Sequence, residues 1–401
     1  MTRRLYYDDS LLTEFDAVVT GCIRNGDGWL CTLDRSAFYP TSGGQPYDTG
    51  TISCPDGRVC KVTDVECDGE GEVWHTISDE IAVGTAVRCV IDRERRRDHM
   101  EQHGGEHLLA GAIWRHFRGT TIGLHLGKED STIDVSFPDG RTHLTEEEIT
   151  LLERQVNCWI RLDAPVKCYF ADPSEIPGIP LRKPPTVTEN IRIVQYGDFE
   201  YCACGGTHPT RSGMIGQIKI LSALPSKGKV RISFVCGERA EKRLRTGFQT
   251  LKELSDRLSC HWADTLDAVS LLQQRNEELA KENVRKNEII ARYETERACR
   301  EPLVCCGRKI AIIELPFDDK KFLARFASAV AGRTGMIIFA ALKPDNGVRF
   351  FCMCRPDDDP ADLRKAIAPL NAKGGGRAEM VQGTVQADDI RPRLTEAFRN
   401  M

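Results

Sequence analysis

The chain has 401 residues, enough for two to three domains that each bury a core of their own. Its 55 basic and 59 acidic side chains leave a formal charge of −4, which excludes polyanion binding through overall charge, so a nucleic-acid site must be local. No apolar run follows the basic pair Arg3-Arg4, no other stretch approaches the length of a membrane span, and the 17 cysteines are an odd number. We therefore expect a cytoplasmic protein with no membrane partner and mostly reduced, buried cysteines.

Residues 1–92 predict a small β-barrel. From residue 14 onward, short runs of β-forming residues alternate with clusters of Gly, Asp and Pro, as in a barrel of short strands. The glycine-rich stretch 38–46 lies inside this segment.

Residues 93–236 predict an α+β domain. Asp92 or Asp98 can begin a helix that runs to about Phe117, because apolar residues and histidines recur there at helical spacing. A capping box at Thr145 begins a second helix with one apolar face, and strands fill the remainder of the segment.

Residues 237–300 predict a helical hairpin or coiled-coil linker. The composition changes to Glu, Lys, Arg, Leu and Gln without proline, and apolar residues recur at heptad-like positions on either side of a turn expected at 259–264. The polar heptad residues Asn276 and Asn283 suit either an intramolecular spacer or the seam of a homodimer formed through the C-terminal half.

Residues 301–401 predict a compact α/β domain. Apolar strands expected at 309–313 and 336–340 alternate with helical patterns at 320–330 and 362–370. The chain as a whole is expected to be of the α+β class, with barrel, α+β domain, helical linker and C-terminal α/β domain in that order.

Two pairs of side chains predict a metal site. His103 and His107 lie four residues apart on the expected helix and project from one face, as two imidazoles must to share an ion. Cys204 and His208 repeat this spacing about a hundred residues later. Three nitrogens and one thiolate suit Zn²⁺.

Two neighbouring residues offer alternative ligands. His99 is also four residues from His103, and Cys202 lies two residues before Cys204, so either could replace a ligand at one end of the set. We assign both to supporting or structural positions.

The segments around these pairs resemble a known family. QHGGEHLL at 102–109 and CGGTH at 204–208 look like the HxxxH and CxxxH motifs of the editing domain, or second additional domain, shared by alanyl- and threonyl-tRNA synthetases and the free-standing alanyl-tRNA editing proteins. LDRSAFYPTSGGQ at 33–45 resembles the glycine-rich segment that precedes this domain in alanyl-tRNA synthetase. GGGRAEMVQG at 374–383 is similar to the signature that closes its DHH-associated C-terminal domain. The resemblance covers essentially the whole chain.

The resemblance implies a trans-editing hydrolase of the long form. Such an enzyme would deacylate seryl-tRNA(Ala), and also glycyl-tRNA(Ala), with mischarged tRNA(Ala) as its partner and Zn²⁺ as its cofactor. We expect no aminoacylation activity, because there is no room for a class II aminoacylation domain ahead of the barrel.

The resemblance also implies roles for individual residues. Thr41 and Gln45 match positions that line the amino-acid pocket, where a hydroxyl or amide can hydrogen-bond the serine hydroxyl and so spare alanyl-tRNA. We therefore expect Thr41, Gln45, His103 and Cys204 to take part in catalysis.

Two basic segments are candidates for tRNA contact. Arg93, Arg96 and Arg97 form a cluster just before the metal-binding residues, and residues 301–401 carry 16 Lys and Arg against 13 Asp and Glu, a net of +3. In that last segment the expected loop 374–377 offers backbone N–H groups and one guanidinium to a phosphate, through Gly375, Gly376 and Arg377.

Two other functions remain open at this stage. Glu106 departs from the uncharged residue usual in related sequences and creates the string HxxEH, which also describes inverted zinc peptidases, with the glutamate as general base and a distant glutamate as third ligand. In an editing enzyme we expect Glu106 to be solvated or to support a ligand. The second alternative is a non-catalytic tRNA-binding module, because four protein ligands are typical of structural zinc.

Overall fold

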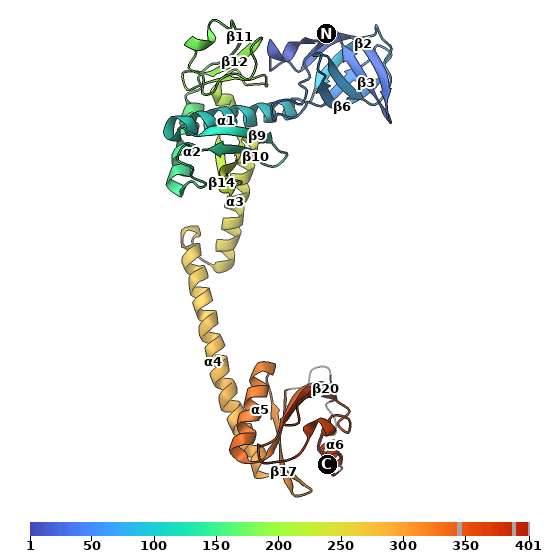
Figure 1. Ribbon diagram of the computed structural model, residues 1–401, viewed down its shortest axis with the longest axis vertical. Coiled ribbons are helices and arrows are strands. Elements are labelled where there is room, and N and C mark those ends of the chain that lie inside the picture. Colours follow the sequence, from blue (N-terminus) through green and yellow to red (C-terminus); the bar gives the residue numbers. More distant parts are fainter. Residues whose placement is uncertain (343–346, 387–389, 400–401) are drawn as a thin grey trace. The chain divides into compact units, whose positions relative to one another are not determined.

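The computed structural model describes residues 1–342, 347–386 and 390–399. These residues form two compact units, Met1–Glu253 and Leu254–Met401, which we describe separately (Figure 1). No helix among the described residues is both long enough and apolar enough to cross a membrane.

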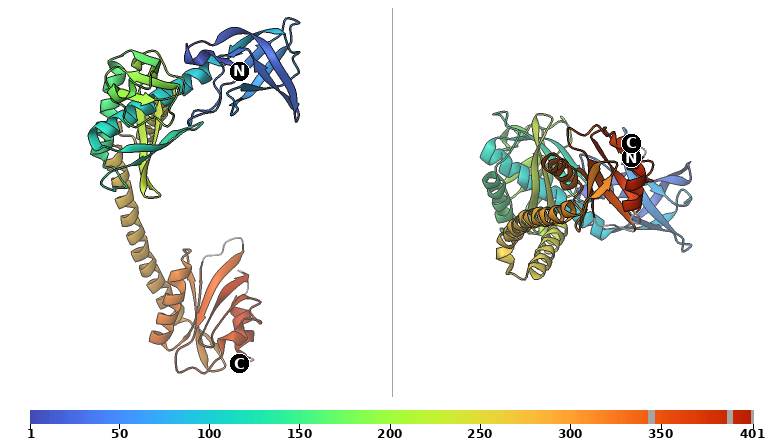
Figure 2. Two further views of the ribbon diagram at one scale, coloured as in Figure 1. Left: turned by 45° about the horizontal axis from the view of Figure 1, so that its top comes forward. Right: turned by 90° about the horizontal axis from the view of Figure 1, so that it is seen from below.

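The first unit begins with a closed six-stranded barrel, as the sequence predicts (Figure 2). Inward and outward side chains alternate along its longest strand, with Phe15, Ala17 and Val19 buried between exposed neighbours, because successive side chains of a strand point to opposite faces. In barrel order the strands are β2 (Glu14–Asn25), β3 (Gly28–Leu33), β7 (Val73–Ile77), β6 (Val59–Cys67), β5 (Gly50–Ser53) and β8 (Ala86–Ile91).

Short elements connect the barrel to the rest of the unit. Strand β1 (Arg3–Arg4) pairs in parallel with β4 (Arg35–Ser36), and a 3₁₀ turn follows at Leu5–Tyr7. After β4, the glycine-rich segment leaves the barrel and its Gln45 reaches Thr207, 162 residues further along the chain.

Helix α1 (Arg93–Phe117) follows the last barrel strand. Asp92 caps its N-terminus by accepting hydrogen bonds from the backbone N–H groups of Glu94 and Arg95, and Arg118 ends the helix in a left-handed conformation. All residues from His99 to Ile113 are buried, so both faces of this part of the helix pack against protein.

An antiparallel sheet and a second helix enclose α1. The sheet runs β14 (Ile218–Ser226), β15 (Lys229–Cys236), β10 (Ser131–Ser136) and β9 (Thr120–Leu126). Helix α2 (Glu146–Arg161) begins with the predicted capping box, in which Thr145 and Glu148 each bond the other's backbone N–H, and it buries Leu152, Val156 and Trp159.

A three-stranded sheet carries the second predicted ligand pair. Its strands are β11 (Val166–Ala171), β12 (Ile191–Tyr196) and β13 (Glu200–Ala203), all antiparallel, and Cys204 follows β13 directly. The short turn Ile176–Gly178 lies between β11 and β12, and Ser212–Ile215 follows β13. Helix α3 (Gly237–Leu258) then leaves the unit.

The second unit begins at Leu254, within the end of α3, and continues with a short 3₁₀ turn, Trp262–Asp264, and helix α4 (Thr265–Arg300), so the break predicted at 259–264 is present. Leu271, Leu272, Leu279, Val284 and Ile289 of α4 are exposed, and the coiled coil or homodimer seam stays a prediction.

A six-stranded mixed sheet forms the rest of this unit, with α5 (Lys320–Thr334) and α4 on one face and α6 (Ile390–Arg399) on the other. The sheet runs β16 (Leu303–Cys305), β17 (Arg308–Leu315), β18 (Ile337–Leu342), β19 (Val348–Cys354), β21 (Met380–Gln386) and β20 (Lys373–Gly376).

Two predictions for this unit were wrong. The helical pattern at 362–370 forms only a 3₁₀ turn at Leu363–Ala366. The expected glycine loop is an edge strand, because Gly374 and Gly376 pair with Gly383 and Val381. A Cβ at Gly374 would lie 2.2 Å from the Gln382 carbonyl oxygen, so the glycines allow close strand pairing there.

Candidate metal centre

Helix α1 supplies the first two side chains of the centre. His103 and His107 lie one turn apart, are 3% and 2% exposed, and have ring centroids 5.2 Å apart. The helix carries glycines at 104 and 105, where a Cβ would lie 2.8 Å from the Tyr196 hydroxyl and 2.1 Å from the Cys236 sulfur. The glycines therefore let the neighbouring elements approach the helix beside the two histidines.

The loop after β13 supplies the other two side chains. Arg192 holds this loop from β12, because its Nη1 donates hydrogen bonds to the carbonyls of Cys204 and Gly206 at 3.0 and 2.9 Å. At Gly206 a Cβ would lie 2.2 Å from the His103 ring, so only glycine lets the loop pass this close.

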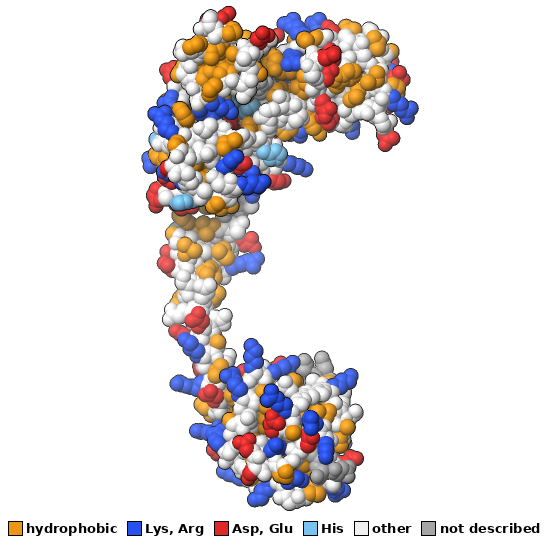
Figure 3. Space-filling model, in the orientation of Figure 1, with side chains coloured by type: hydrophobic (Ala, Val, Ile, Leu, Met, Phe, Trp, Pro, Cys, Tyr) orange, Lys and Arg blue, Asp and Glu red, His pale blue; other side chains and the backbone are white. Residues whose placement is uncertain are grey.

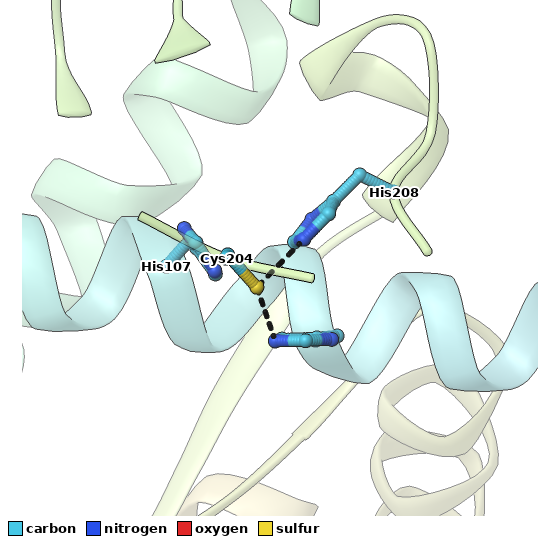
Figure 4. A group of neighbouring side chains, drawn as sticks. His107, Cys204 and His208 are labelled. Atoms are coloured by element: carbon cyan, nitrogen blue, oxygen red, sulfur yellow. Dashed lines mark hydrogen bonds between the residues drawn. The ribbon is translucent and has the colours of Figure 1, made fainter. Parts of the chain in front are cut away.

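The four side chains converge, as the sequence predicts. The Cys204 sulfur lies 3.5 Å from His103 Nε2 and 3.4 Å from His208 Nε2, and Figure 4 shows His107 beside them. One ligand atom from each of the four residues lies within 4.8 Å of the others. Cys204 is half-buried as a residue, but its sulfur faces the three buried imidazoles.

The two alternative ligands lie outside this set. The described residues contain two groups of side chains that could hold a metal ion, and His99 belongs to neither. Cys202 belongs to the other group, with His107 and Glu200.

Hydrogen bonds fix the orientation of two of the imidazoles. His103 Nδ1 lies 2.8 Å from Gln45 Oε1, which also accepts from the Thr207 backbone N–H at 3.1 Å. His208 Nδ1 lies 2.9 Å from the Tyr196 hydroxyl. In both rings Nε2 is left to face the cluster, which is how a ring is prepared to bind a metal. His107 Nδ1 is buried with no hydrogen-bond partner among the described residues.

Burial controls the protonation of the cluster. It lowers the pKa of His103 to about 3, with Arg192 adding to the effect, and it lowers the pKa values of His107 and His208 well below the ordinary value. Burial raises the pKa of the Cys204 thiol to about 12. Three neutral imidazoles thus offer lone pairs beside a thiol whose proton a metal ion would displace, and this donor set fits zinc.

A pocket of 380 Å³ opens onto the cluster. Besides three of the four cluster residues, its walls come from Gly43, from β9 and from the segment that holds Arg182 and Lys183. Glu106 also lines it, and burial raises the pKa of this carboxyl against the opposing influence of the two cations. Glu106 is 5% exposed, which contradicts the solvated alternative, whereas the alternative that it supports a ligand stays a prediction.

The structure corrects the role predicted for Gln45. Its side chain is fully buried, and its amide contacts His103 and Thr207, so Gln45 lies behind the metal cluster and does not line the pocket. Thr41 is exposed and is likewise not among the residues that line the pocket; its backbone N–H bonds to the Val65 carbonyl at 3.0 Å.

The predicted tRNA contacts divide into two kinds. Arg96 is 1% exposed, pairs with Asp48, and donates to the carbonyls of Ser10 and Ala37, so the prediction that it contacts phosphate was wrong. Arg93 and Arg97 are exposed, although Arg97 pairs with Glu101 and Glu238.

In the second unit, Gly375, Gly376 and Arg377 are exposed. Figure 3 shows Lys and Arg side chains spread over the visible face of this unit, among Asp and Glu side chains. Contact of these three residues with tRNA stays a prediction.

Sequence reasoning missed a buried ion pair beside the pocket. Arg182 Nε donates to Glu200 Oε1 at 2.9 Å, and each side chain is 3% exposed. Burial raises the pKa of Glu200 to about 7, and Arg182 opposes the shift. Nothing in the local spacing indicates this pair, because its members come from an irregular segment and from β13.

Two segments of the chain match family models of tRNA synthetases. Residues 9–95 match a model of class II (A) tRNA synthetases, and residues 191–233, which include Cys204 and His208, match the second additional domain of threonyl- and alanyl-tRNA synthetases. The chain thus carries a synthetase-type editing module. The alanyl-tRNA editing protein AlaX-L of Pyrococcus horikoshii is 30% identical over 96% of this chain and 95% of its own length. This chain belongs to the family of alanyl-tRNA editing proteins.

Alanine–tRNA ligases are similar over part of their length. The ligase of Pyrococcus furiosus is 35% identical over 70% of this chain and 32% of its own length. The ligase of Archaeoglobus fulgidus is 30% identical over 96% of this chain and 42% of its own length. The chain therefore spans less than half of these relatives. The C-Ala domain of Aquifex aeolicus alanyl-tRNA synthetase aligns with 24% of this chain and 97% of its own at 20% identity, with a TM-score of 0.22, which establishes no shared fold.

Proposed function

We propose that this chain is a zinc-dependent hydrolase that removes serine, and also glycine, from mischarged tRNA(Ala). The observation that carries the proposal is the convergence of His103, His107, Cys204 and His208, the first three of which line a pocket, in a member of the alanyl-tRNA editing family. The proposal concerns hydrolysis and does not include aminoacylation.

Zinc would be held by these four side chains, and when bound it supplies a Lewis acid that stabilises negative charge or activates water. The chain's own residues prepare that site. Gln45 and Tyr196 hold two rings with Nε2 facing inward, and burial keeps the imidazoles neutral. Since an aminoacyl ester is already labile, positioning of the ester and of a water molecule accounts for most of the catalysis required.

The proposed partner is the acceptor end of tRNA(Ala). Arg93 and Arg97 are the exposed members of the basic cluster at the start of α1, and we propose them as phosphate contacts, together with Arg377 and its neighbouring glycines in the second unit. The exposed apolar side chains of α4 support a homodimer as the alternative to an intramolecular spacer.

The peptidase alternative loses support in this geometry. It needs His103 and His107 to share a metal with a glutamate. The two histidines converge with Cys204 and His208, and Glu200 groups with His107 and Cys202 but not with His103. A non-catalytic module stays the second candidate, because four protein ligands leave no open position on a tetrahedral zinc.

The test is deacylation of seryl-, glycyl- and alanyl-tRNA(Ala) by the purified chain and by His103→Ala. We expect the seryl and glycyl esters to be cleared, the alanyl ester to survive, and His103→Ala to be inactive while its circular dichroism is unchanged. A wild-type chain that retains zinc and hydrolyses none of the three esters would contradict the proposal and favour the binding module.

A further inference from the structure

One carboxylate in the pocket has no partner. Glu106 lies on α1 between the two histidines, is 95% buried, and lines the pocket. Among the described residues, no hydrogen bond or ion pair reaches its carboxylate. Its oxygens are not among the fully shielded polar atoms without a partner, so they face the pocket, where water or a ligand can reach them. A carboxylate held in this way is placed to pair with a cation that enters the pocket.

Of the two cations that influence the pKa of Glu106, Arg182 is already paired with another acid. Arg182 is paired with Glu200 and also donates through Nη1 to Thr121 Oγ1 at 2.5 Å. Lys183, on the same segment, lines the pocket but forms no ion pair with Glu106. Glu106 is therefore a second carboxylate in a region where the buried guanidinium of Arg182 already pairs with Glu200.

Glu106 is also not placed as a metal ligand. Both groups of metal-binding type among the described residues leave it out, although it is next in sequence to His107. Its carboxylate is available to whatever occupies the pocket.

We propose that Glu106 binds the α-ammonium group of the aminoacyl ester and so selects esters with a free amine. This rests on the proposed function, because it concerns the substrate of that same site. The α-ammonium is the one cation that every aminoacyl ester carries, and it lies one carbon from the carbonyl that reacts. A carboxylate beside the metal cluster meets it while the carbonyl lies at the cluster. Esters whose amine is blocked, such as peptidyl-tRNA, would be rejected because they leave the carboxylate unpaired.

The test compares two esters of the same tRNA(Ala), one of serine and one of 3-hydroxypropanoate, which is serine without its amine. The value of kcat/KM is measured for both with the wild type, with Glu106→Gln and with Glu101→Gln. Glu101 is a matched control, because it is a buried acid on the same helix that does not line this pocket. Each value is divided by the uncatalysed rate, since the ammonium also makes the ester intrinsically more labile.

We expect the wild type and Glu101→Gln to prefer the seryl ester by about tenfold or more, the size of one charge-assisted hydrogen bond. Glu106→Gln should lose most of that preference by slowing the seryl ester alone. Equal slowing of both esters by Glu106→Gln would overturn the proposal and indicate a general base, and an unchanged preference would overturn it as well. A wild type that hydrolyses neither ester would instead refute the proposed function.

Discussion

Buried histidines occur in both halves of the first unit, and their surroundings differ. In the barrel, His75 is fully buried, with Nδ1 2.9 Å from the Cys31 carbonyl and Nε2 2.8 Å from the Ser36 hydroxyl, so both ring nitrogens are satisfied. In the editing module, three buried imidazoles crowd around one thiol. Burial lowers the pKa of His75 to about 4 and of His103 to about 3, so a low pKa does not separate the two cases.

What separates them is where the second nitrogen points. Both nitrogens of His75 have partners within the barrel, and such a ring needs nothing else. His103 and His208 each contact an oxygen through Nδ1 and turn Nε2 toward Cys204. The single thiol proton cannot satisfy both Nε2 atoms, so hydrogen bonds within the cluster leave at least one ring nitrogen without a partner. A candidate metal centre therefore differs from an ordinary buried histidine in having ring nitrogens that the protein's own hydrogen bonds do not satisfy.

The largest effect should come from Cys204→Ala. Removing the only sulfur ligand should reduce bound zinc from one equivalent to well below one and lower kcat/KM for seryl-tRNA(Ala) by about a thousandfold, since a bound metal contributes several kcal/mol to transition-state stabilisation. Zinc is measured by mass spectrometry of the dialysed protein. The matched control is Cys202→Ala, which should keep its zinc. A Cys204→Ala protein with full zinc and full activity would refute the assigned ligand set.

His75 should make the barrel sensitive to acid. Its pKa falls from 6.5 to about 4 on folding, mainly through burial, while Cys31 and Glu72 oppose the shift, so the unfolded chain binds more protons between these values. Its contribution to stability is complete above pH 6.5 and is lost as the pH falls to 4, about 3 kcal/mol in total and about 2 kcal/mol by pH 5.

The measurement is urea unfolding at pH 7.5 and pH 5, followed by tryptophan fluorescence. His75→Gln should be less stable at pH 7.5 but should lose less stability on acidification than the wild type. If both proteins lose the same amount, titration of His75 is not the cause.

A smaller effect is expected from Gln45→Ala. Losing the acceptor of His103 Nδ1 should weaken zinc binding by about 10- to 100-fold, the range found for partners behind metal ligands. Gln45→Glu keeps an acceptor and should restore most of the affinity, which is measured by competition with a chelator. The equivalent change in the barrel, Ser36→Ala, should lower stability by about 1 kcal/mol and leave zinc affinity unchanged. Equal zinc affinity in Gln45→Ala and the wild type would refute a positioning role.

The sequence predicted the local parts of this architecture. The helix at Asp92, the capping box at Thr145 and the turn before Thr265 depend on neighbouring residues, and the structure confirms all three. Each predicted ligand pair is also a local feature, because its two residues lie only four positions apart in the sequence. The site residues that were misjudged depend on distant contacts. Nothing near Arg96 shows that it, and not Arg93, points toward Asp48.

Gln45 is a second residue whose role depends on contacts with residues distant in the sequence. The glycine-rich motif indicated a functional loop, but the orientation of the amide depends on how the barrel docks against α1 and the loop after β13. Glu106 was visible in the sequence as an unusual residue. That it forms no ion pair with the described residues, although Arg182 and Lys183 influence its pKa, became evident only once Arg182 was found paired with Glu200.

The link from Gln45 to Thr207 and His103 also sets an order of events during synthesis. Residue 45 emerges from the ribosome long before residue 208, and the amide cannot orient His103 until the barrel has met the loop after β13. Tight metal loading should thus follow completion of the first unit and should not nucleate it.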